Sequence, residues 1–201
     1  MANPYGDVEL DARGMRALAH PVRLAILTRL QNEGPSTATR LSETVGASPS
    51  VTSWHLRQLA GHGLVRDASD AAALRDHGRE RWWEAVSRGF RFAAEPGDDD
   101  TAQAARALEQ VMESVEGDLV ARWRAEDEPH LEPQWRHLAG RANTRILVTV
   151  EELEAVEAAI EQILTPYVLR KDEPAGSHPA GTRSVRLLRY TLPARPDGPA
   201  S

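Results

Sequence analysis

The chain has 201 residues, 41% of them hydrophobic, so it is long enough for one large domain or two small ones with a packed core. It contains no cysteine, which excludes disulfides, thiolate metal sites and thiol redox switches. Because it lacks both a long apolar run and the basic-then-apolar pattern of a signal peptide, we expect a cytoplasmic protein with no membrane partner.

The net charge of −6 is unevenly distributed. Residues 1–92 hold 12 Arg against 10 Asp and Glu, whereas residues 93–201 hold 12 Arg and Lys against 20 Asp and Glu. This asymmetry favours an N-terminal module that can approach phosphates and an acidic C-terminal module that would not.

Three helices are predicted before residue 47. Asp11 is a suitable N-cap for the first, which ends where His20–Pro21 interrupts it. The second covers residues 22–32 and carries a broad apolar stripe. The third is short, is capped at residue 36 or 37 and ends at Gly46.

A fourth helix follows, with Ser48 as its N-cap and Pro49 in its first turn. At 100° per residue, Thr52, Leu56 and Leu59 form an inward seam. The opposite side gathers Ser50, Ser53, Trp54 and Arg57. Their hydroxyl, indole and guanidinium groups can donate to phosphates or base edges, so this face is a candidate for DNA contact.

His55 lies near the edge of the inward seam. Packing or a structural hydrogen bond is the favoured interpretation of this residue, and DNA contact is the alternative.

The order of these elements has the layout of a helix-turn-helix: a helix, a short helix, a turn and a second amphipathic helix.

A hairpin is predicted next, from strands at residues 63–66 and 78–86 joined by a long loop over residues 67–77. Alternation places Arg79 and Arg81 on one face of the return strand. Two arginines beside such a hairpin can clamp phosphates or enter a minor groove, as the wing of a winged helix does.

The motifs LAHPVRLAIL, LSETVGASPSVTSWHLRQLAGHGLV and GRERWW resemble those of ArsR-type winged helix-turn-helix transcriptional regulators, particularly actinobacterial members with a C-terminal extension. The resemblance covers residues 11 to about 90. It implies that residues 48–62 are the recognition helix and residues 66–83 the wing, which adds Arg66 to the candidate DNA contacts.

The chain departs from the metal-sensing members of that family. It has no cysteine, and His130 and His137 do not reproduce the usual acid–histidine spacing. Seven residues apart, these histidines would share a face of one continuous helix, but nearby prolines oppose such a helix. Surface or capping roles are favoured for them, and no metal or other cofactor is expected.

The second half begins with an acidic linker at residues 93–100, followed by a helix over residues 101–126 that would be roughly 40 Å long. So long a helix needs a second chain or the rest of this one to cover it. In the resembled family, the corresponding helix joins the first helix in a homodimer, and two recognition helices one DNA turn apart then read a two-fold symmetric site.

A β-α-β unit is predicted beyond this helix. Its strands are residues 145–150 and 184–192, and between them a Thr149–Glu152 capping box starts a helix that ends before Pro166. A flexible tail follows from residue 193. The unit could reinforce a dimer or bind a small-molecule effector; reinforcement is favoured, because no polar cluster converges there.

The fold expected is mainly α with a small amount of β structure. Its domains are a winged helix-turn-helix domain over residues 1–92, a long helix with a small α+β region for dimerisation over residues 93–192, and a tail over residues 193–201. No nucleophile elbow, P-loop, GxGxxG or HExxH motif occurs, so we expect no enzyme. The expected function is a homodimeric repressor that binds a palindromic site in double-stranded DNA. The alternatives are a protein-interaction module that does not bind DNA, and a regulator that responds to a small molecule.

Overall fold

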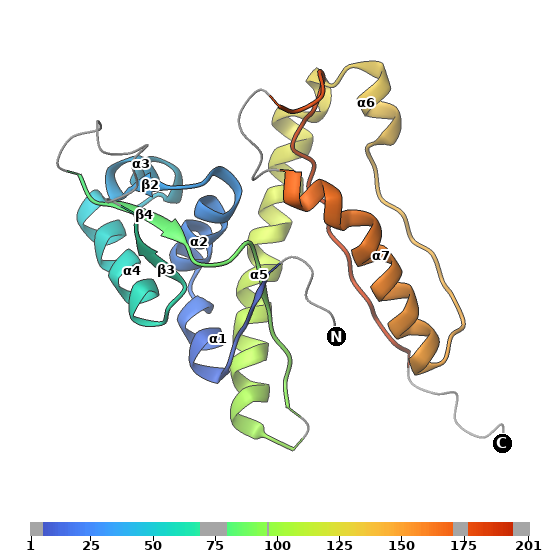
Figure 1. Ribbon diagram of the computed structural model, residues 1–201, viewed down its shortest axis with the longest axis horizontal. Coiled ribbons are helices and arrows are strands. Elements are labelled where there is room, and N and C mark those ends of the chain that lie inside the picture. The colour runs from blue at the N-terminus through green and yellow to red at the C-terminus, as the bar shows by residue number, and fades with distance from the viewer. Residues whose placement is uncertain (1–5, 69–79, 96, 171–176, 195–201) are drawn as a thin grey trace.

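The computed structural model describes residues 6–68, 80–95, 97–170 and 177–194. Helices dominate it and the sheets are small, which confirms the predicted fold class (Figure 1). The elements in chain order are β1 (Val8–Glu9), α1 (Ala12–Leu18), α2 (Pro21–Glu33), β2 (Ser36–Thr37), α3 (Ala38–Val45), α4 (Pro49–Gly61), β3 (Val65–Asp67), β4 (Trp82–Ala85), β5 (Phe90–Arg91), α5 (Asp99–Glu126), the 3-10 helix η2 (Glu128–His130), α6 (Pro133–Leu138) and α7 (Val150–Arg170).

The first four helices begin where the sequence predicts, because polar side chains satisfy the free amides of their first turns. Asp11 accepts a hydrogen bond from the Gly14 amide at 2.7 Å, and Ser48 accepts one from the Val51 amide at 3.4 Å. Gly46 ends α3 with a φ of 67°, a left-handed conformation that glycine adopts without strain.

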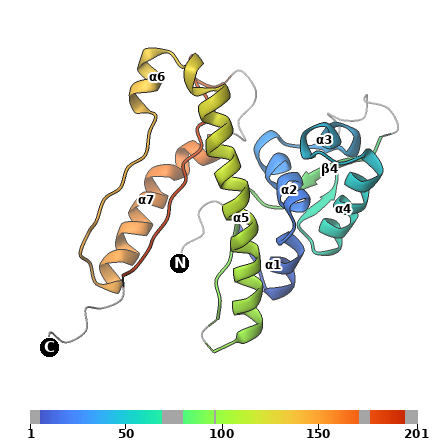
Figure 2. The ribbon, with the colours of Figure 1, turned by 180° about the vertical axis from the view of Figure 1, so that it is seen from behind.

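The hydrophobic core lies among α1, α2, α3, α4 and the first half of α5. These helices surround one cluster of buried side chains, with the small sheet closing one side (Figures 1 and 2). The large members of the cluster are Met15, Leu18, Ile26, Leu27, Leu30, Leu41, Leu56, Leu59, Leu64, Trp83 and Leu108. The apolar stripe predicted for α2 is therefore its core-facing side.

The predicted wing hairpin is present. β3 and β4 pair antiparallel, with Arg66 opposite Glu84. Residues 69–77 of the loop predicted between them, and residues 78–79 of the predicted return strand, lie outside the described residues. β2 adds a third strand to β4, and β1 pairs with β5 in parallel; neither pairing is predicted from the sequence. Strands of two residues show no alternation of side chains, so only their tertiary partners define them.

α5 confirms the long helix predicted after the acidic linker. The side chain of Asp98 accepts a hydrogen bond from the Asp100 amide at 2.9 Å, at the positive end of the helix dipole. Ala104, Ala105 and Leu108 are buried in the core that α5 shares with α1. This chain itself therefore covers the first half of α5.

The two strands predicted in the C-terminal region are wrong. Residues 141–149 and 184–192 have no regular secondary structure, and Val150 already belongs to α7. α7 lies between the two segments in both views (Figures 1 and 2). Because a strand needs a hydrogen-bonded neighbour, a suitable residue pattern is not sufficient to form one.

The Thr149–Glu152 capping box is confirmed. The Thr149 amide donates to Glu152 Oε2 at 2.8 Å, and the Glu152 amide donates to Thr149 Oγ1 at 3.2 Å. The predicted end of this helix before Pro166 is wrong, because α7 continues to Arg170. A proline inside a helix removes one amide donor; Pro166 is exposed, so water can satisfy the carbonyl that this leaves free.

His130 and His137 lie on separate short helices, η2 and α6. The continuous helix that would place them on one face is not formed. Within the described ranges, no group of three or more acidic or histidine side chains is arranged to hold a metal ion. In the same part of the chain, no helix combines the length and the apolar character needed to span a bilayer.

Candidate nucleic-acid interface

α4 presents two contrasting faces. Thr52, Leu56 and Leu59 have no exposed surface and form the inward seam that the periodicity predicts. On the other side Ser50 and Arg57 are exposed, Trp54 is 49% exposed and Ser53 is half-buried. The exposed set, with the N-cap Ser48, is called the α4 polar face below.

Most of the α4 polar face is available to a partner. Arg57 forms no ion pair with any residue in the described part of the chain, so its guanidinium can contact an incoming anion without leaving a carboxylate. The hydroxyl oxygens of Ser48 and Ser50 lie 3.1 Å apart at the start of the helix. Pro49 has no amide hydrogen and the Val51 amide donates to Ser48 Oγ, so the first turn offers two hydroxyls and the Ser50 amide to a phosphate oxygen.

His55 is not part of this face. It is only 4% exposed, and its ring centroid lies 4.7 Å from that of His20 and 4.8 Å from that of Trp54. The packing interpretation of His55 is therefore confirmed. The structure does not place His55 with the exposed candidate DNA contacts, because its ring is buried against His20 at the start of α2.

His20 connects this cluster to the start of α2. Its Nδ1 accepts a hydrogen bond from the Val22 amide at 3.2 Å, so the ring caps the helix in place of the usual hydroxyl or carboxylate. Accepting that bond requires an unprotonated Nδ1. The Nδ1 atom of His55 is buried without a hydrogen-bond partner among the described residues.

The pKa values of both histidines are lowered from their ordinary value. Burial is the main cause for each, because it disfavours the charged ring. The Arg23 guanidinium lowers the pKa of His20 further, and for His55 both His20 and Arg23 add to the effect. Folding therefore favours the neutral form of both rings.

These shifts predict a loss of stability in mild acid. The unfolded chain binds protons at a histidine pKa of about 6.5, whereas the folded chain binds them only at lower pH. The stabilisation is complete above pH 6.5 and is lost as the pH falls from there through the folded pKa values. Melting temperatures measured between about pH 7.5 and pH 5.5 are expected to fall.

Two substitutions test the source of that fall. His20→Asn keeps a capping side chain and His55→Gln keeps a polar group of similar size, and the pair together should flatten the pH profile. His62→Gln is the matched control, since His62 is an exposed histidine at the end of the same helix. If the control flattens the profile as much as the pair does, the buried cluster is not responsible.

The arginines of the wing differ from Arg57 because carboxylates already hold them. Arg66 Nε lies 2.6 Å from Glu84 Oε1, and Arg81 Nε lies 2.6 Å from Asp67 Oδ2. Both remain largely exposed, at 65% and 61% of the side chain. A DNA phosphate must therefore compete with a carboxylate for each. Arg79, the third predicted wing contact, lies outside the described residues.

α3 supplies a cation, Arg40, that is not among the contacts predicted from the sequence. Arg40 is exposed, and its Cζ lies 4.9 Å from the ring centroid of Trp82 on β4. Cation–π contacts of this kind hold a guanidinium in place while leaving its donors free. Sequence spacing could not reveal this residue, because the contact depends on how α3 packs against the hairpin.

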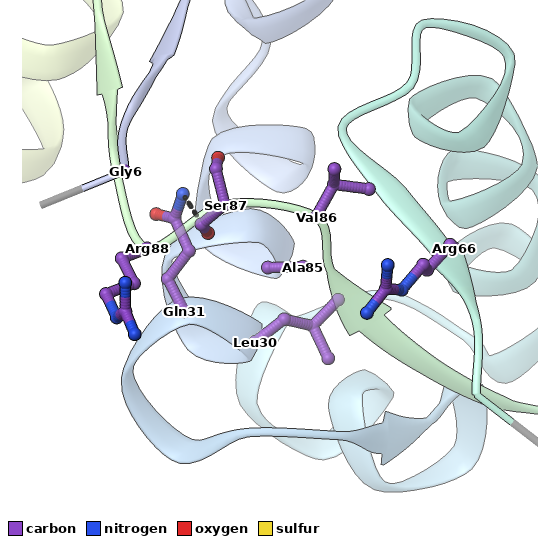
Figure 3. A pocket seen from close by; sticks show the side chains of 8 residues that line it. All are labelled: Gly6, Leu30, Gln31, Arg66, Ala85, Val86, Ser87 and Arg88. Carbon is purple, nitrogen blue, oxygen red and sulfur yellow. Dashed lines mark hydrogen bonds between the residues drawn. The ribbon is translucent and has the colours of Figure 1, made fainter. Parts of the chain in front are cut away.

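A shallow pocket of about 360 Å³ opens between the C-terminal end of α2 and the end of β4. Arg66 and Arg88 lie on opposite sides of it, and the Gln31 side-chain amide donates to the Ser87 carbonyl at 3.4 Å within it (Figure 3). This pocket belongs to the N-terminal domain. It is distinct from the C-terminal region, in which an effector site was the alternative prediction.

Comparisons with known proteins agree with this geometry. The family described as Helix-turn-helix domain matches residues 18–68, which extend from the end of α1 to just past β3. The HTH-type transcriptional regulator YgaV of Escherichia coli K12 is 34% identical over 74 residues, which are 37% of this chain and 75% of that protein. The HTH-type transcriptional regulator NmtR of Mycobacterium tuberculosis is 48% identical over 54 residues, 27% of this chain and 44% of that protein.

Proposed function

The chain belongs to the HTH-type transcriptional regulators, and from that premise we propose that it is an ArsR-type homodimeric repressor that binds an approximately palindromic DNA site through α4. The observation that carries the proposal is the α4 polar face. It presents Arg57, unpaired among the described residues, beside exposed hydroxyls and an indole. These groups suit the major groove of duplex DNA.

The buried side of α4 supports this role because it anchors the helix in the core. Leu56 and Leu59 are fully buried in the core, and Thr52 lies beside them. A helix anchored by a buried seam loses little freedom when its other side meets a ligand. Packing of the opposite side therefore presents the α4 polar face in one orientation.

The charge of residues 1–92 favours a mode of DNA binding in which the protein neutralises few phosphates. Residues 1–92 have only a small excess of arginine, and two of the wing arginines share their charge with carboxylates. Each phosphate that a cation neutralises adds about 0.9 to the slope of log K against log salt. We expect a slope that corresponds to few contacts per protomer, with Arg57 and Arg40 contributing to it.

The test uses the full chain and a duplex pool of random sequence. Repeated selection from the pool should recover a site with two-fold symmetric half-sites about one DNA turn apart. Binding to the recovered site should weaken with salt, with the modest slope that few phosphate contacts give, and should exceed binding to the unselected pool by a factor of about 1,000 or more. Failure to recover any site, with little binding even at low salt, would instead favour a protein-interaction module.

A further inference from the structure

Two apolar side chains lie exposed on the side of α4 that faces away from the core. Val51 is 44% exposed and Trp54 is 49% exposed, and their spacing of three residues makes them neighbours on the helix surface. α4 lies at the outer side of the N-terminal domain, with α5 and α7 beyond the far side of that domain in both views (Figures 1 and 2). These two helices therefore do not cover the apolar pair.

Trp54 lies at the centre of this exposed side. At about 100° per residue, Ser50 and Arg57 lie about 40° and about 60° from it in one direction, and Val51 lies about 60° from it in the other. Val51 is not among the contacts predicted from the sequence. A groove that receives Ser50 and Arg57 must therefore also receive the indole ring that lies between them and Val51.

The indole of Trp54 is held from behind by a buried ring. Its centroid lies 4.8 Å from that of His55, with the two ring planes at 72° in a T-shaped contact. His55 is buried and packs in turn against His20. Val51 is β-branched, so its side chain has little rotational freedom in a helix. Both apolar side chains are thus held in place before a ligand arrives, which keeps the entropic cost of binding low.

The chemistry of the indole selects among the four bases. In the major groove, thymine alone presents an apolar group, its C5 methyl, beside a hydrogen-bond acceptor, O4. The indole likewise combines an apolar ring with a single N–H donor. That donor has no hydrogen-bond partner among the described residues. The other bases offer Trp54 acceptors or an amino group without an apolar neighbour, so thymine is its best complement.

We propose that Trp54 and Val51 together recognise a thymine in each half-site of the DNA. The apolar parts of both side chains contact the C5 methyl, and the indole N–H donates to O4 of the same base. This inference rests on the proposed function for the entry of α4 into the major groove, and it names one base that α4 selects there.

The test uses the full chain and the DNA site recovered by selection. Each thymine of one half-site is replaced in turn by deoxyuridine, which lacks only the C5 methyl and still pairs with adenine. Affinity is measured by fluorescence anisotropy at one fixed salt concentration. At one position, the loss of the methyl should lower wild-type affinity by about 3- to 10-fold, the value of one buried methyl group. Replacement at positions that α4 does not contact should have no effect.

Variants assign that effect to Trp54. Trp54→Ala should bind the thymine site about 10-fold or more weakly, and its thymine-to-uracil ratio should fall below about 2-fold, because the contact that distinguishes the two bases is gone. Arg57→Ala should bind more weakly but keep the wild-type ratio. Val51→Ala should lower the ratio, whereas Val86→Ala is its matched control, since Val86 is exposed after β4 and not on α4.

The outcomes separate this inference from the proposed function. If a site is recovered but wild type binds every uracil duplex as well as the thymine duplex, the inference is overturned and the proposed function stands. A Trp54→Ala variant that melts like the wild type and keeps the full ratio also overturns it, because another group then contacts the methyl. If no duplex binds at all, the proposed function fails and the inference fails with it.

Discussion

Replacing Leu56 by alanine is expected to lower the free energy of unfolding by about 2–5 kcal/mol. Leu56 has no exposed surface and lies on the inner side of α4 in the core. Truncation removes its contacts and leaves a cavity that helices anchored on several sides cannot close. Urea unfolding followed by circular dichroism measures the change, provided that the dependence on denaturant stays constant.

The neighbouring residue supplies the control. Arg57→Ala lies one step along the same helix but on its exposed side, so its stability should change by no more than about 0.5 kcal/mol. A Leu56→Ala variant that loses less than about 1 kcal/mol would contradict the assignment of this side as core.

Arg57→Ala is expected to weaken binding to the selected DNA site by about 1–3 kcal/mol, or roughly 5- to 150-fold, if the guanidinium reads a base edge. Arg57 is exposed in the middle of α4 and needs to break no ion pair with a described residue to reach DNA. Fluorescence anisotropy with a labelled duplex at one fixed salt concentration measures the loss.

Two further variants define what the loss means. Arg13→Ala removes an exposed arginine of α1, a helix that packs against α5 and is not part of the α4 polar face, and should leave affinity nearly unchanged. Arg57→Lys keeps the charge but not the bidentate geometry, so it should lower affinity for the selected site more than for random duplex. Equal losses on both duplexes would make Arg57 a phosphate contact.

The wing arginines should matter less than Arg57. A phosphate that binds Arg66 or Arg81 replaces a carboxylate already 2.6 Å away, so only the difference between the two partners contributes to affinity. Exposed ion pairs are worth little, which makes this exchange possible but keeps the gain small. The sequence identifies Arg66 and Arg81 as candidate contacts. Their carboxylate partners depend on how β3 pairs with β4, which the sequence does not give.

Local spacing was sufficient for the helices of the N-terminal domain. Asp11, Ser48 and Gly46 mark helix ends through bonds or backbone angles that involve only their near neighbours in sequence. The seam of Thr52, Leu56 and Leu59 follows from 3.6 residues per turn, and so does the polar side opposite. His55 stood at the boundary between these sides, and only its contacts with His20 and Trp54 decided its place.

Spacing failed where a partner distant in sequence decides the structure. β2, β1 and β5 are too short to show a pattern, and they exist because folding brings their neighbours beside them. Residues 145–150 and 184–192 have the pattern of strands, but they belong to neither sheet in the described part of the chain. A residue pattern indicates that a segment is able to form a strand. It does not show whether another strand lies beside that segment in the folded chain.

The sequence by itself therefore determined the helix-turn-helix, the inward and outward sides of α4 and the long helix α5, because each depends on residues within a few turns of one another. The tertiary structure alone decided that His55 is buried, that Glu84 and Asp67 hold the wing arginines, and that the C-terminal segments remain without a sheet. Each of these depends on the distance between groups far apart in the chain, which only packing determines.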